Sequence, residues 1–401
     1  MIEKEKYEEF KANGAFRLEK FEYVSPDVPK GTVINKLEML FSPREVNLTS
    51  FDAVIGKSDI KLNGKLQNFI PYALKGETIK GNLSLNSDIL DLNQFLAEEE
   101  DMQPQPEATA DTAPMELFEV PRNINFVMKS NIGQIFYDKL VIKNVSGGIT
   151  IVDGKVLLDK LKMNLLEGSM LMNCEYNTQD LTRPFVDMDI DIKHFDIPSS
   201  FVAFNTIQKL APIAENAKGY FSMGMKFRSL LDKTMSPVMN SIVGQGDFSS
   251  ESVEIVNSKT FSKIADITQN EKLKNVKLDN VAFDFEIKDG RVYVDPFDTK
   301  IGKSKLNITG DNGLDQTINY AMKLAIPRSE LGSAGQALNS LNAAAAAKGI
   351  TLSQSENISL ALKIGNTIMD PKVTMEMLAD NAGKNIKDQA KAQLTNKIDD
   401  T

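Results

Sequence analysis

The sequence contains one cysteine, Cys174, and one histidine, His194. A disulfide within one chain is therefore impossible, and a zinc site built from His and Cys is excluded because it needs three or four such ligands. A Ser-His-Asp or Cys-His catalytic mechanism would have to use His194. A chain without disulfides is compatible with both the cytosol and the periplasm, so the cysteine content does not indicate a compartment.

Long apolar runs are also missing from the 401 residues. No stretch approaches the roughly 18 consecutive apolar residues of a transmembrane helix, and the first ten residues, MIEKEKYEEF, lack the apolar core of a signal peptide. We therefore expect either a cytosolic protein or the downstream part of a longer one. The formal net charge of -9 argues against nucleic acid as a partner.

One stretch of the sequence occurs twice. FDAVIGKSDIKLNG (51–64) and FDTKIGKSKLNITG (297–310) are identical at half of their positions. Both contain Gly-Lys-Ser, but a phosphate-binding loop needs an earlier glycine, where Phe51 and Phe297 stand, and a helix afterwards. Alternating strand-like residues follow instead. The repeat therefore indicates a structural unit, with a degraded third copy in which Gly168 takes the place of the first glycine of Gly-Lys-Ser.

Apolar and polar residues alternate with a period of two along much of the chain, which is typical of strands with one apolar face. Asp153-Gly154, Asp289-Gly290 and Asn312-Gly313 stand between such runs and predict tight hairpin turns. We predict a mainly β (β-rich α+β) fold: an elongated, curled antiparallel meander of repeated hairpin units, with an apolar groove and a few helices toward the C-terminal half. The residues predicted to line the groove are Val186, Met188, Ile190, Ile192, Val281, Phe283, Phe285, Ile287, Tyr320, Met322, Leu324, Ile358, Leu360, Leu362 and Ile364.

Helices are predicted after Ser199-Ser200, with a bend at Pro212, over Lys259 to Asn270, and from Ser329-Glu330 to Gly349. The predicted organisation has four parts: an N-terminal β segment (1–97), a flexible acidic linker or loop rich in Pro, Ala and Thr (98–116), a β-groove region with inserted helices (117–375), and a C-terminal helix (376–401). Because the repeat occurs on both sides of 98–116, we expect this segment to be a loop of one sheet.

Three segments resemble the AsmA-like family of Gram-negative envelope proteins: GNLSLNSDILDLNQFL (81–96), the segment 274–310 around FEIKDGRVYV, and IGNTIMDPKV (364–373). The resemblance extends from about Lys11 to Met375. It implies a relationship to bridge-like lipid transfer proteins, a location on the periplasmic side of the inner membrane in the cell envelope, and a role in outer-membrane biogenesis. The N-terminal anchoring helix of that family is absent from this sequence.

The expected function is non-enzymatic. A curled sheet can leave part of its apolar face uncovered, and such a surface binds acyl chains. We expect phospholipid or another acyl lipid as ligand, and inner- and outer-membrane proteins as partners, with no catalytic, cofactor or metal site. Three alternatives stay open. The apolar residues can instead close into a core, the protein can be a periplasmic scaffold for outer-membrane protein assembly, or paired carboxylates can make it a glycan-acting enzyme.

Overall fold

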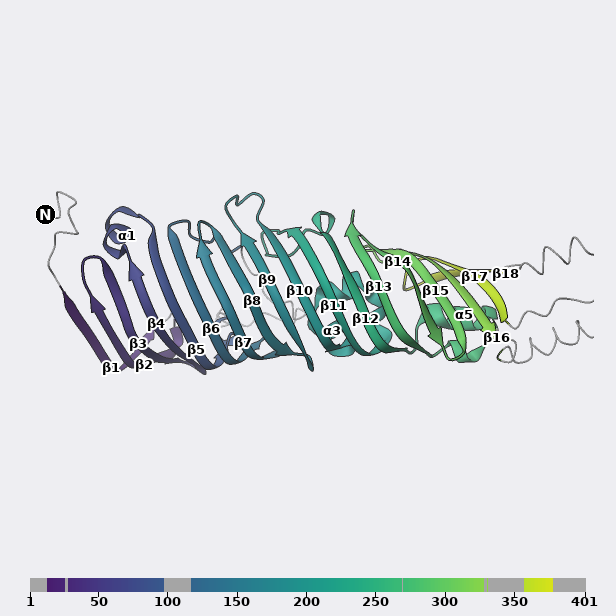
Figure 1. The fold of residues 1–401 in the computed structure, drawn as a ribbon, viewed down its shortest axis with the longest axis horizontal. Helices are drawn as coiled ribbons and strands as arrows, with labels where there is room; N and C mark the ends of the chain where they lie inside the picture. Colours follow the sequence, from purple (N-terminus) through teal and green to yellow (C-terminus); the bar gives the residue numbers. More distant parts are fainter. Residues whose placement is uncertain are drawn as a thin grey trace, which may run out of the picture. The chain divides into compact units, whose positions relative to one another are not determined.

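The computed structural model describes residues 13–25, 28–96, 117–268, 270–327, 330 and 357–377. In this part of the chain the protein is mainly β: 18 strands belong to one curled sheet, with few helices (Figure 1). The predicted fold class is confirmed in these respects. The chain divides into two compact units, which are described separately: a first unit of residues 1–195 and 223–244, and a second unit of residues 196–222 and 245–401.

In the first unit, each strand pairs with the next one along the chain. Its strands are β1 Gly14–Ser25, β2 Val28–Phe41, β3 Glu45–Ile55, β4 Ser58–Gln67, β5 Ile79–Asp91, β6 Ile124–Tyr137, β7 Leu140–Val152, β8 Lys155–Leu165, β9 Gly168–Asn177 and β10 Phe185–Asp196, and its helices are α1 Phe69–Lys75 and α2 Asn93–Leu96. Two further strands, β11 Ala217–Leu230 and β12 Val243–Ile255, contribute residues to both units.

One strand pair of the first unit departs from the predicted antiparallel meander. β5 and β6 run parallel, with Ile79 opposite Ile124 and Leu85 opposite Ser130. Parallel neighbours need a connection that returns to the end of the sheet where the first strand began. Residues 92–123 make this connection, and the predicted linker 98–116 lies in it, outside the described residues. The strands on either side of it are therefore direct neighbours.

In the second unit, the strands β13 Val276–Lys288, β14 Arg291–Ile301, β15 Ser304–Gly313, β16 Ile318–Pro327, β17 Asn357–Asn366 and β18 Pro371–Met377 pair antiparallel in chain order. Its helical elements are α3 Ile197–Ala203, α4 Asn205–Leu210, η3 Pro212–Asn216, α5 Lys259–Thr268 and η5 Glu271–Leu273; another short turn, η4, spans Met239–Ser241. Helix α5 agrees with the helix predicted over Lys259 to Asn270.

The predicted helix at Ser199-Ser200 begins earlier. Asp196 is its N-cap, and the Asp196 carboxylate accepts a hydrogen bond of 2.8 Å from the backbone N–H of Ser199. Helical structure stops at Leu210 and resumes as a 3-10 turn at Pro212, which cannot donate a backbone hydrogen bond within a helix. The helix predicted up to Gly349 falls almost entirely outside the described residues. So does the C-terminal helix, except that residues 376 and 377 belong to strand β18.

Two of the three predicted hairpin turns are confirmed. Asp153 and Gly154 have φ of 48° and 75°, and Asp289 and Gly290 have φ of 52° and 69°, as a two-residue turn with both φ positive requires. The prediction for Asn312-Gly313 was wrong. Strand β15 continues through both residues, and the turn lies at 314–317.

The duplicated sequence forms the same hairpin twice. Gly56-Lys57 connects β3 to β4, and Gly302-Lys303 connects β14 to β15. Gly56 and Gly302 have φ of 55° and 56° at the first turn position. A strand follows each turn instead of a helix, so neither copy has the architecture of a phosphate-binding loop. The repeat is therefore structural.

The degraded third copy is the β8–β9 hairpin, but its alignment differs from the prediction. Leu166 and Glu167 form the turn, with φ of 49° and 67°, and Leu165 pairs with Gly168 as Ile55 pairs with Ser58. Gly168 therefore corresponds to Ser58, not to Gly56. A side chain at Gly168 would have its Cβ 2.2 Å from the backbone oxygen of Lys193, so the tight approach of β10 requires glycine here.

The second unit has a closed apolar core on the inner face of its sheet. Helix α5 buries Phe261, Ile264 and Ala265. Its Lys263 side chain donates hydrogen bonds to the backbone oxygen of Pro371 (2.6 Å) and to the carboxylate of Asp370 (3.0 Å), which fix the helix to the start of β18. Four phenylalanine rings of β11 to β14 follow one another with centroids 4.9–5.6 Å apart, the first two pairs stacked and the third tilted: Phe221, Phe248, Phe283 and Phe297.

Candidate functional site: an open apolar face

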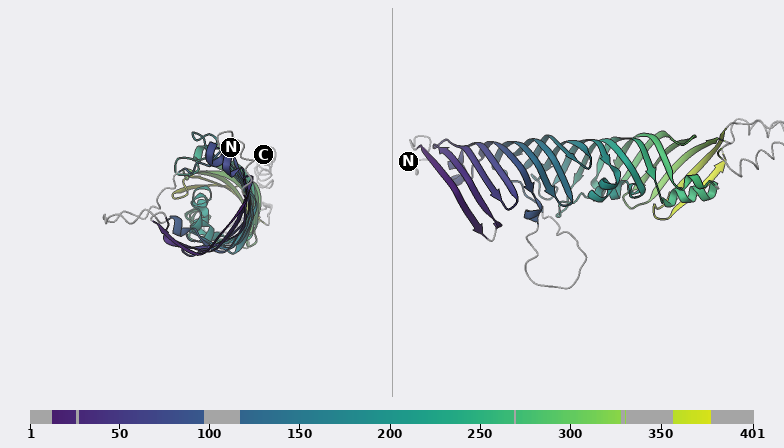
Figure 2. Two further views of the ribbon diagram at one scale, coloured as in Figure 1. Left: turned by 90° about the vertical axis from the view of Figure 1, so that its left-hand side faces the viewer. Right: turned by 90° about the horizontal axis from the view of Figure 1, so that it is seen from below.

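The candidate site is the inner face of the first unit, where the strands curl (Figure 2). Directly paired residues of neighbouring strands share one face of a sheet, so the pairing traces rows of side chains across strands. One row contains Leu48, Gly64, Leu83, Met128, Ile149, Leu158, Cys174 and Met188, and the next contains Phe51, Leu62, Leu85, Ser130, Gly147, Leu161, Met172 and Ile190. The step from Gly147 to Leu161 crosses a shift in register, and the two residues approach closely there. Neither row contains a charged residue.

The large apolar side chains of these two rows are partly exposed to solvent. We call this set the open strip; it consists of Leu48, Phe51, Leu62, Leu83, Leu85, Met128, Ile149, Leu158, Leu161, Met172, Cys174, Met188 and Ile190, all of intermediate exposure. The next row, toward the β3–β4 turn, is largely buried: Ala53 is 0%, Ile132 5%, Val145 3% and Ile192 6% exposed. The strip is therefore an apolar surface that is partly open to solvent.

Local irregularities keep the apolar side chains on this face. Asn144, Lys160 and His194 have positive φ, between 48° and 59°, and each marks a point where a strand bulges. A bulge adds one residue, shifts the alternation by one and increases the twist of the strand. His194 therefore does not continue the face of Ile192. Phe195 takes that place and is fully buried, with 0% exposure.

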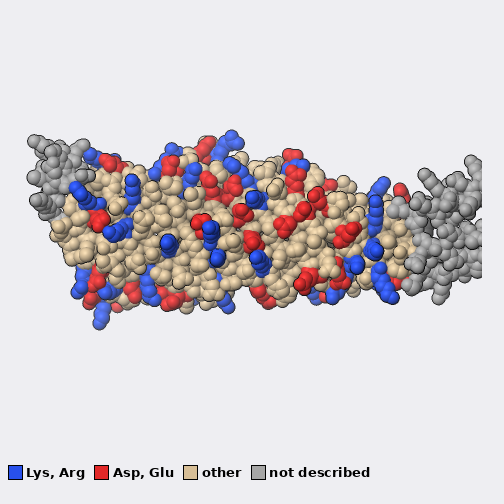
Figure 3. All heavy atoms as spheres, in the orientation of Figure 1, with Lys and Arg blue, Asp and Glu red and all other residues tan. Residues whose placement is uncertain are grey.

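The opposite face of the same strands is polar. Ion pairs join neighbouring strands there, such as Arg17 with Glu38 (2.8 Å) and Lys61 with Asp88 (3.3 Å). Figure 3 shows side chains of both charges interspersed on the face that it presents. This face has no preference for one sign of charge, whereas the inner face has no charge in the two rows of the strip. An uncharged ligand segment is therefore the one that the strip suits.

The groove residues predicted from sequence fall into two classes. Val186, Met188 and Ile190 on β10 are partly exposed beside or within the open strip, and Ile192 is buried at its border. Most of the others lie in the second unit with exposures of at most 5%: Val281, Ile287, Met322, Leu324, Leu360, Leu362 and Ile364. Phe283, Phe285, Tyr320 and Ile358 are of intermediate exposure in the same unit. We therefore centre the site on the first unit.

Sequence reasoning missed the strip residues of β3 to β9. The alternation of Leu83 with Leu85 and of Met170 with Met172 carries the same signal that singled out Ile190. The alternation within one strand does not predict the register between strands, and it is this register that places these residues in one row. The signal that could have found them is the glycine pattern: Gly64 and Gly147 lie within the rows, where strands approach closely.

Cys174 lies in the strip, opposite Met188 and Leu158. Burial raises the pKa of its thiol from 9.0 to about 11, and the nearby Asp187 and Glu175 carboxylates add to this effect. The thiol is therefore protonated at neutral pH and is a poor nucleophile. Because Cys174 lies within the strip, the rate at which its thiol is modified depends on whether a ligand covers the strip.

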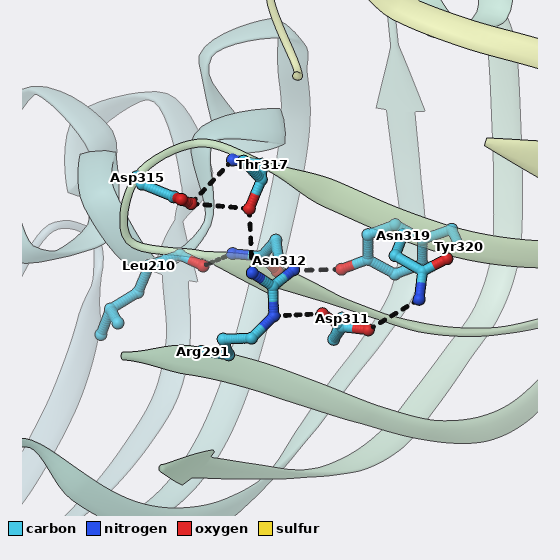
Figure 4. Close-up of polar contacts among 8 residues, drawn as sticks. All are labelled: Leu210, Arg291, Asp311, Asn312, Asp315, Thr317, Asn319 and Tyr320. Carbon is cyan, nitrogen blue, oxygen red and sulfur yellow. Dashed lines mark hydrogen bonds and ion pairs between the residues drawn. The ribbon is translucent and has the colours of Figure 1, made fainter. Parts of the chain in front are cut away.

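A connected polar cluster lies in the second unit, at the β15–β16 turn (Figure 4). Arg291 forms an ion pair with Asp311 and donates a hydrogen bond of 2.9 Å to Thr317. The hydroxyl of Tyr320 donates to the Asn312 side chain at 2.9 Å, and burial raises the pKa of that tyrosine. These groups bond to one another and to the backbone, so the cluster fixes the end of the hairpin.

The described residues contain no group of three or more His, Cys, Asp or Glu that could hold a metal ion. Nor does any helix in that part of the chain have the length and apolar character needed to span a membrane. Every carboxyl group with a shifted pKa there, such as those of Asp59 and Asp232, is shifted downward. Comparisons with protein-family models, curated proteins and solved structures find no match.

Proposed function

We propose that the open strip binds acyl chains of lipids, and that the protein is a non-enzymatic lipid-holding component of the cell envelope that contributes to phospholipid transport between membranes and to outer-membrane biogenesis. The observation that carries the proposal is the uncharged and partly exposed apolar strip from β3 to β10. The sequence resemblance to the AsmA-like family supports the envelope location and the transport role.

The dimensions of the strip suit an acyl chain. Its seven interstrand steps of about 4.8 Å give a length of about 34 Å. The hydrocarbon core of a bilayer is about 30 Å thick for two leaflets, so one acyl chain extends about 15 Å and fits along the strip. Each CH₂ that leaves water contributes about 0.8 kcal/mol. A chain of about 16 carbons with half of its surface covered would gain roughly 6 kcal/mol.

The side chains of the strip hold an apolar ligand without fixing its headgroup. Methionine is flexible and adapts to irregular apolar partners, and the two rows contain Met128, Met172 and Met188. No charged residue in the strip would need to lose its hydration shell when a chain binds. The downward-shifted carboxyl pKa values favour this proposal over a glycan-acting enzyme, whose general acid needs a raised pKa.

Mass spectrometry of lipids extracted from the purified protein tests the proposal directly. Phospholipid or fatty acid at a defined stoichiometry is expected in the wild type. The informative variant is Leu83→Asp, which places a charge in the strip, and the matched control is Ser84→Asp, the next residue on the polar face of β5, beside Lys129. Leu83→Asp should lose most of the lipid while both variants keep the strand content of the wild type by circular dichroism.

A second measurement uses Cys174. After delipidation, a neutral thiol reagent should modify Cys174, and a fatty acid or phospholipid added beforehand should slow this reaction at least several-fold. Equal reaction rates with and without lipid, together with equal lipid retention by the two aspartate variants, would contradict the proposal. Absence of lipid from the wild type and from all reconstituted samples would favour the scaffold alternative.

A further inference from the structure

Strand β1 leaves one edge of the first unit open. Among the strands of its unit, β1 pairs with β2, and its other edge has no described strand beside it. Its inner-face aromatic side chains are among the most exposed on that face: Phe16 is 45%, Phe21 43% and Tyr23 48% exposed. A long open edge with exposed apolar side chains is a template for pairing with another strand.

Proteins usually protect such edges, and β18 of the second unit illustrates this. β18 has seven residues, begins with Pro371 and contacts helix α5. β1 has twelve residues, no proline and no helix packed on it among the described residues. Charged residues along β1 can still discourage pairing of this edge with unsuitable strands. Their order along the strand determines which partner strand fits.

We propose that β1 pairs antiparallel with β1 of a second copy of this chain. In one register, every central residue meets a suitable partner. Phe16 lies opposite Tyr23 of the second copy and Leu18 opposite its Phe21, so apolar residues meet on the inner face. On the outer face Arg17 lies opposite Glu22 of the second copy, and Glu19 opposite its Lys20. Opposite charges directly across strands are favourable, and like charges are not.

The irregularity at Lys20 makes this register possible. Lys20 has φ of 53°, and the two strand halves around it alternate out of phase: Leu18 and Phe21 both face inward, as their pairing with Leu37 and Ile34 of β2 shows. In a regular strand, the same register would place inward residues opposite outward ones. With the shift, both faces are preserved, and the open apolar face of one copy adjoins that of the other.

Charge reversal tests the pairing in the full-length protein. Glu22→Arg places two arginine side chains opposite each other across the two copies, and Arg17→Glu places two glutamate side chains opposite each other. Sedimentation velocity should show dimers for the wild type and at least tenfold weaker association for each variant alone. A mixture of the two variants forms heterodimers in which both contacts between positions 17 and 22 are again between an arginine and a glutamate. Association is therefore expected to recover. Lys80→Glu on β5, which is also an exposed outer-face charge, is the matched control and should dimerise normally.

The proposal does not rest on lipid binding, because the readout is association of delipidated protein. A monomeric wild type at about 100 µM, or dimers of Glu22→Arg that are as stable as those of the wild type, would overturn it. Weak association of the mixed variants would also overturn it, since it would show that the charges act through stability and not through pairing. Binding of the edge to a strand of another protein, with the chain itself monomeric, counts against it too.

Discussion

The side-chain amide of Gln94 donates a buried hydrogen bond of 2.7 Å to the hydroxyl of Ser58. Gln94 also accepts from the backbone N–H of Lys57 and donates to the backbone oxygen of Ile55, each at 3.0 Å. In the second copy of the hairpin, the Ser304 hydroxyl donates to Glu330 at 3.2 Å. Gln94 follows β5 and Glu330 follows β16, the strands that pair with the second strand of each hairpin. In both copies, a side chain from beyond this neighbouring strand therefore forms a hydrogen bond with the hairpin.

The Ser58–Gln94 contact predicts strong energetic coupling. Gln94→Ala removes three hydrogen bonds at the turn, those with the Ser58 hydroxyl, the Lys57 N–H and the Ile55 oxygen, and should lower the free energy of unfolding by about 1–3 kcal/mol. Ser58→Ala removes one partner of the same network. A double-mutant cycle measured by urea denaturation should give a coupling of about 0.5–3 kcal/mol. Additive effects of the two substitutions would show that the hydrogen bonds do not stabilise the hairpin.

The glycines that close the repeated sequence predict a second effect. Gly64 has φ of 148°, and a Cβ on it would lie 2.1 Å from the backbone oxygen of Asn82; Gly310 has φ of 155° and the same problem with Asn319. Gly64→Ala should therefore lower the free energy of unfolding by about 1–3 kcal/mol. Gly148→Ala is the control, because its Cβ would have ordinary contacts of 3.6–3.9 Å. Equal thermal midpoints for the two variants would refute the argument.

The strands and several turns could be predicted from local sequence, because the signals are local. Asp153-Gly154 adopts the turn that its residue types favour. Asn312-Gly313 does not, because a distant contact decides the conformation: the Asn312 side chain donates to the backbone oxygen of Leu210 at 2.8 Å and accepts from Tyr320. Such a contact cannot be read from the dipeptide alone.

The candidate site was predictable only in part for a similar reason. Ile190 and Leu362 have the same alternating sequence context, yet Ile190 is partly exposed and Leu362 is 1% exposed. Alternation identifies the apolar face of each strand but not what packs on it. It also fails at bulges, as at His194, where one additional residue brings Phe195 to the inner face. Exposure and register are properties of the folded sheet.

Asp59 predicts a loss of stability in acid. Burial tends to raise its pKa, but the backbone N–H groups of Ile89 (2.7 Å) and Asp88 (2.8 Å) donate to its carboxylate and the net pKa is lowered from 3.8. Because the folded protein binds this proton less readily than the unfolded chain, the stabilisation is complete above about pH 4 and is lost as the pH falls further.

Asp59→Asn tests this contribution. The variant should be less stable than the wild type by about 1–2 kcal/mol at pH 7, and the difference should shrink as the pH falls below about 4. Asp159→Asn, at an exposed position on β8, is the matched control for the loss of one carboxyl group. Urea denaturation at a series of pH values measures the difference. A constant gap between Asp59→Asn and the wild type down to pH 2 would contradict the assignment.

Cys174 predicts a change at the alkaline end. Because burial raises its pKa to about 11, the rate of modification of the delipidated protein by a neutral thiol reagent should keep rising up to about pH 11, whereas the rate for an exposed cysteine levels off near pH 9.

The same pKa shift makes stability depend on pH. The folded state holds the thiol proton more tightly than the unfolded chain, so the contribution of Cys174 to the free energy of unfolding is complete below about pH 9 and is lost as the pH rises toward 11. Cys174→Ala should not show this alkaline loss. A modification rate that levels off near pH 9 would mean that the thiol is hydrated, and that the centre of the strip is more open to water than its neighbours Met188 and Leu158 indicate.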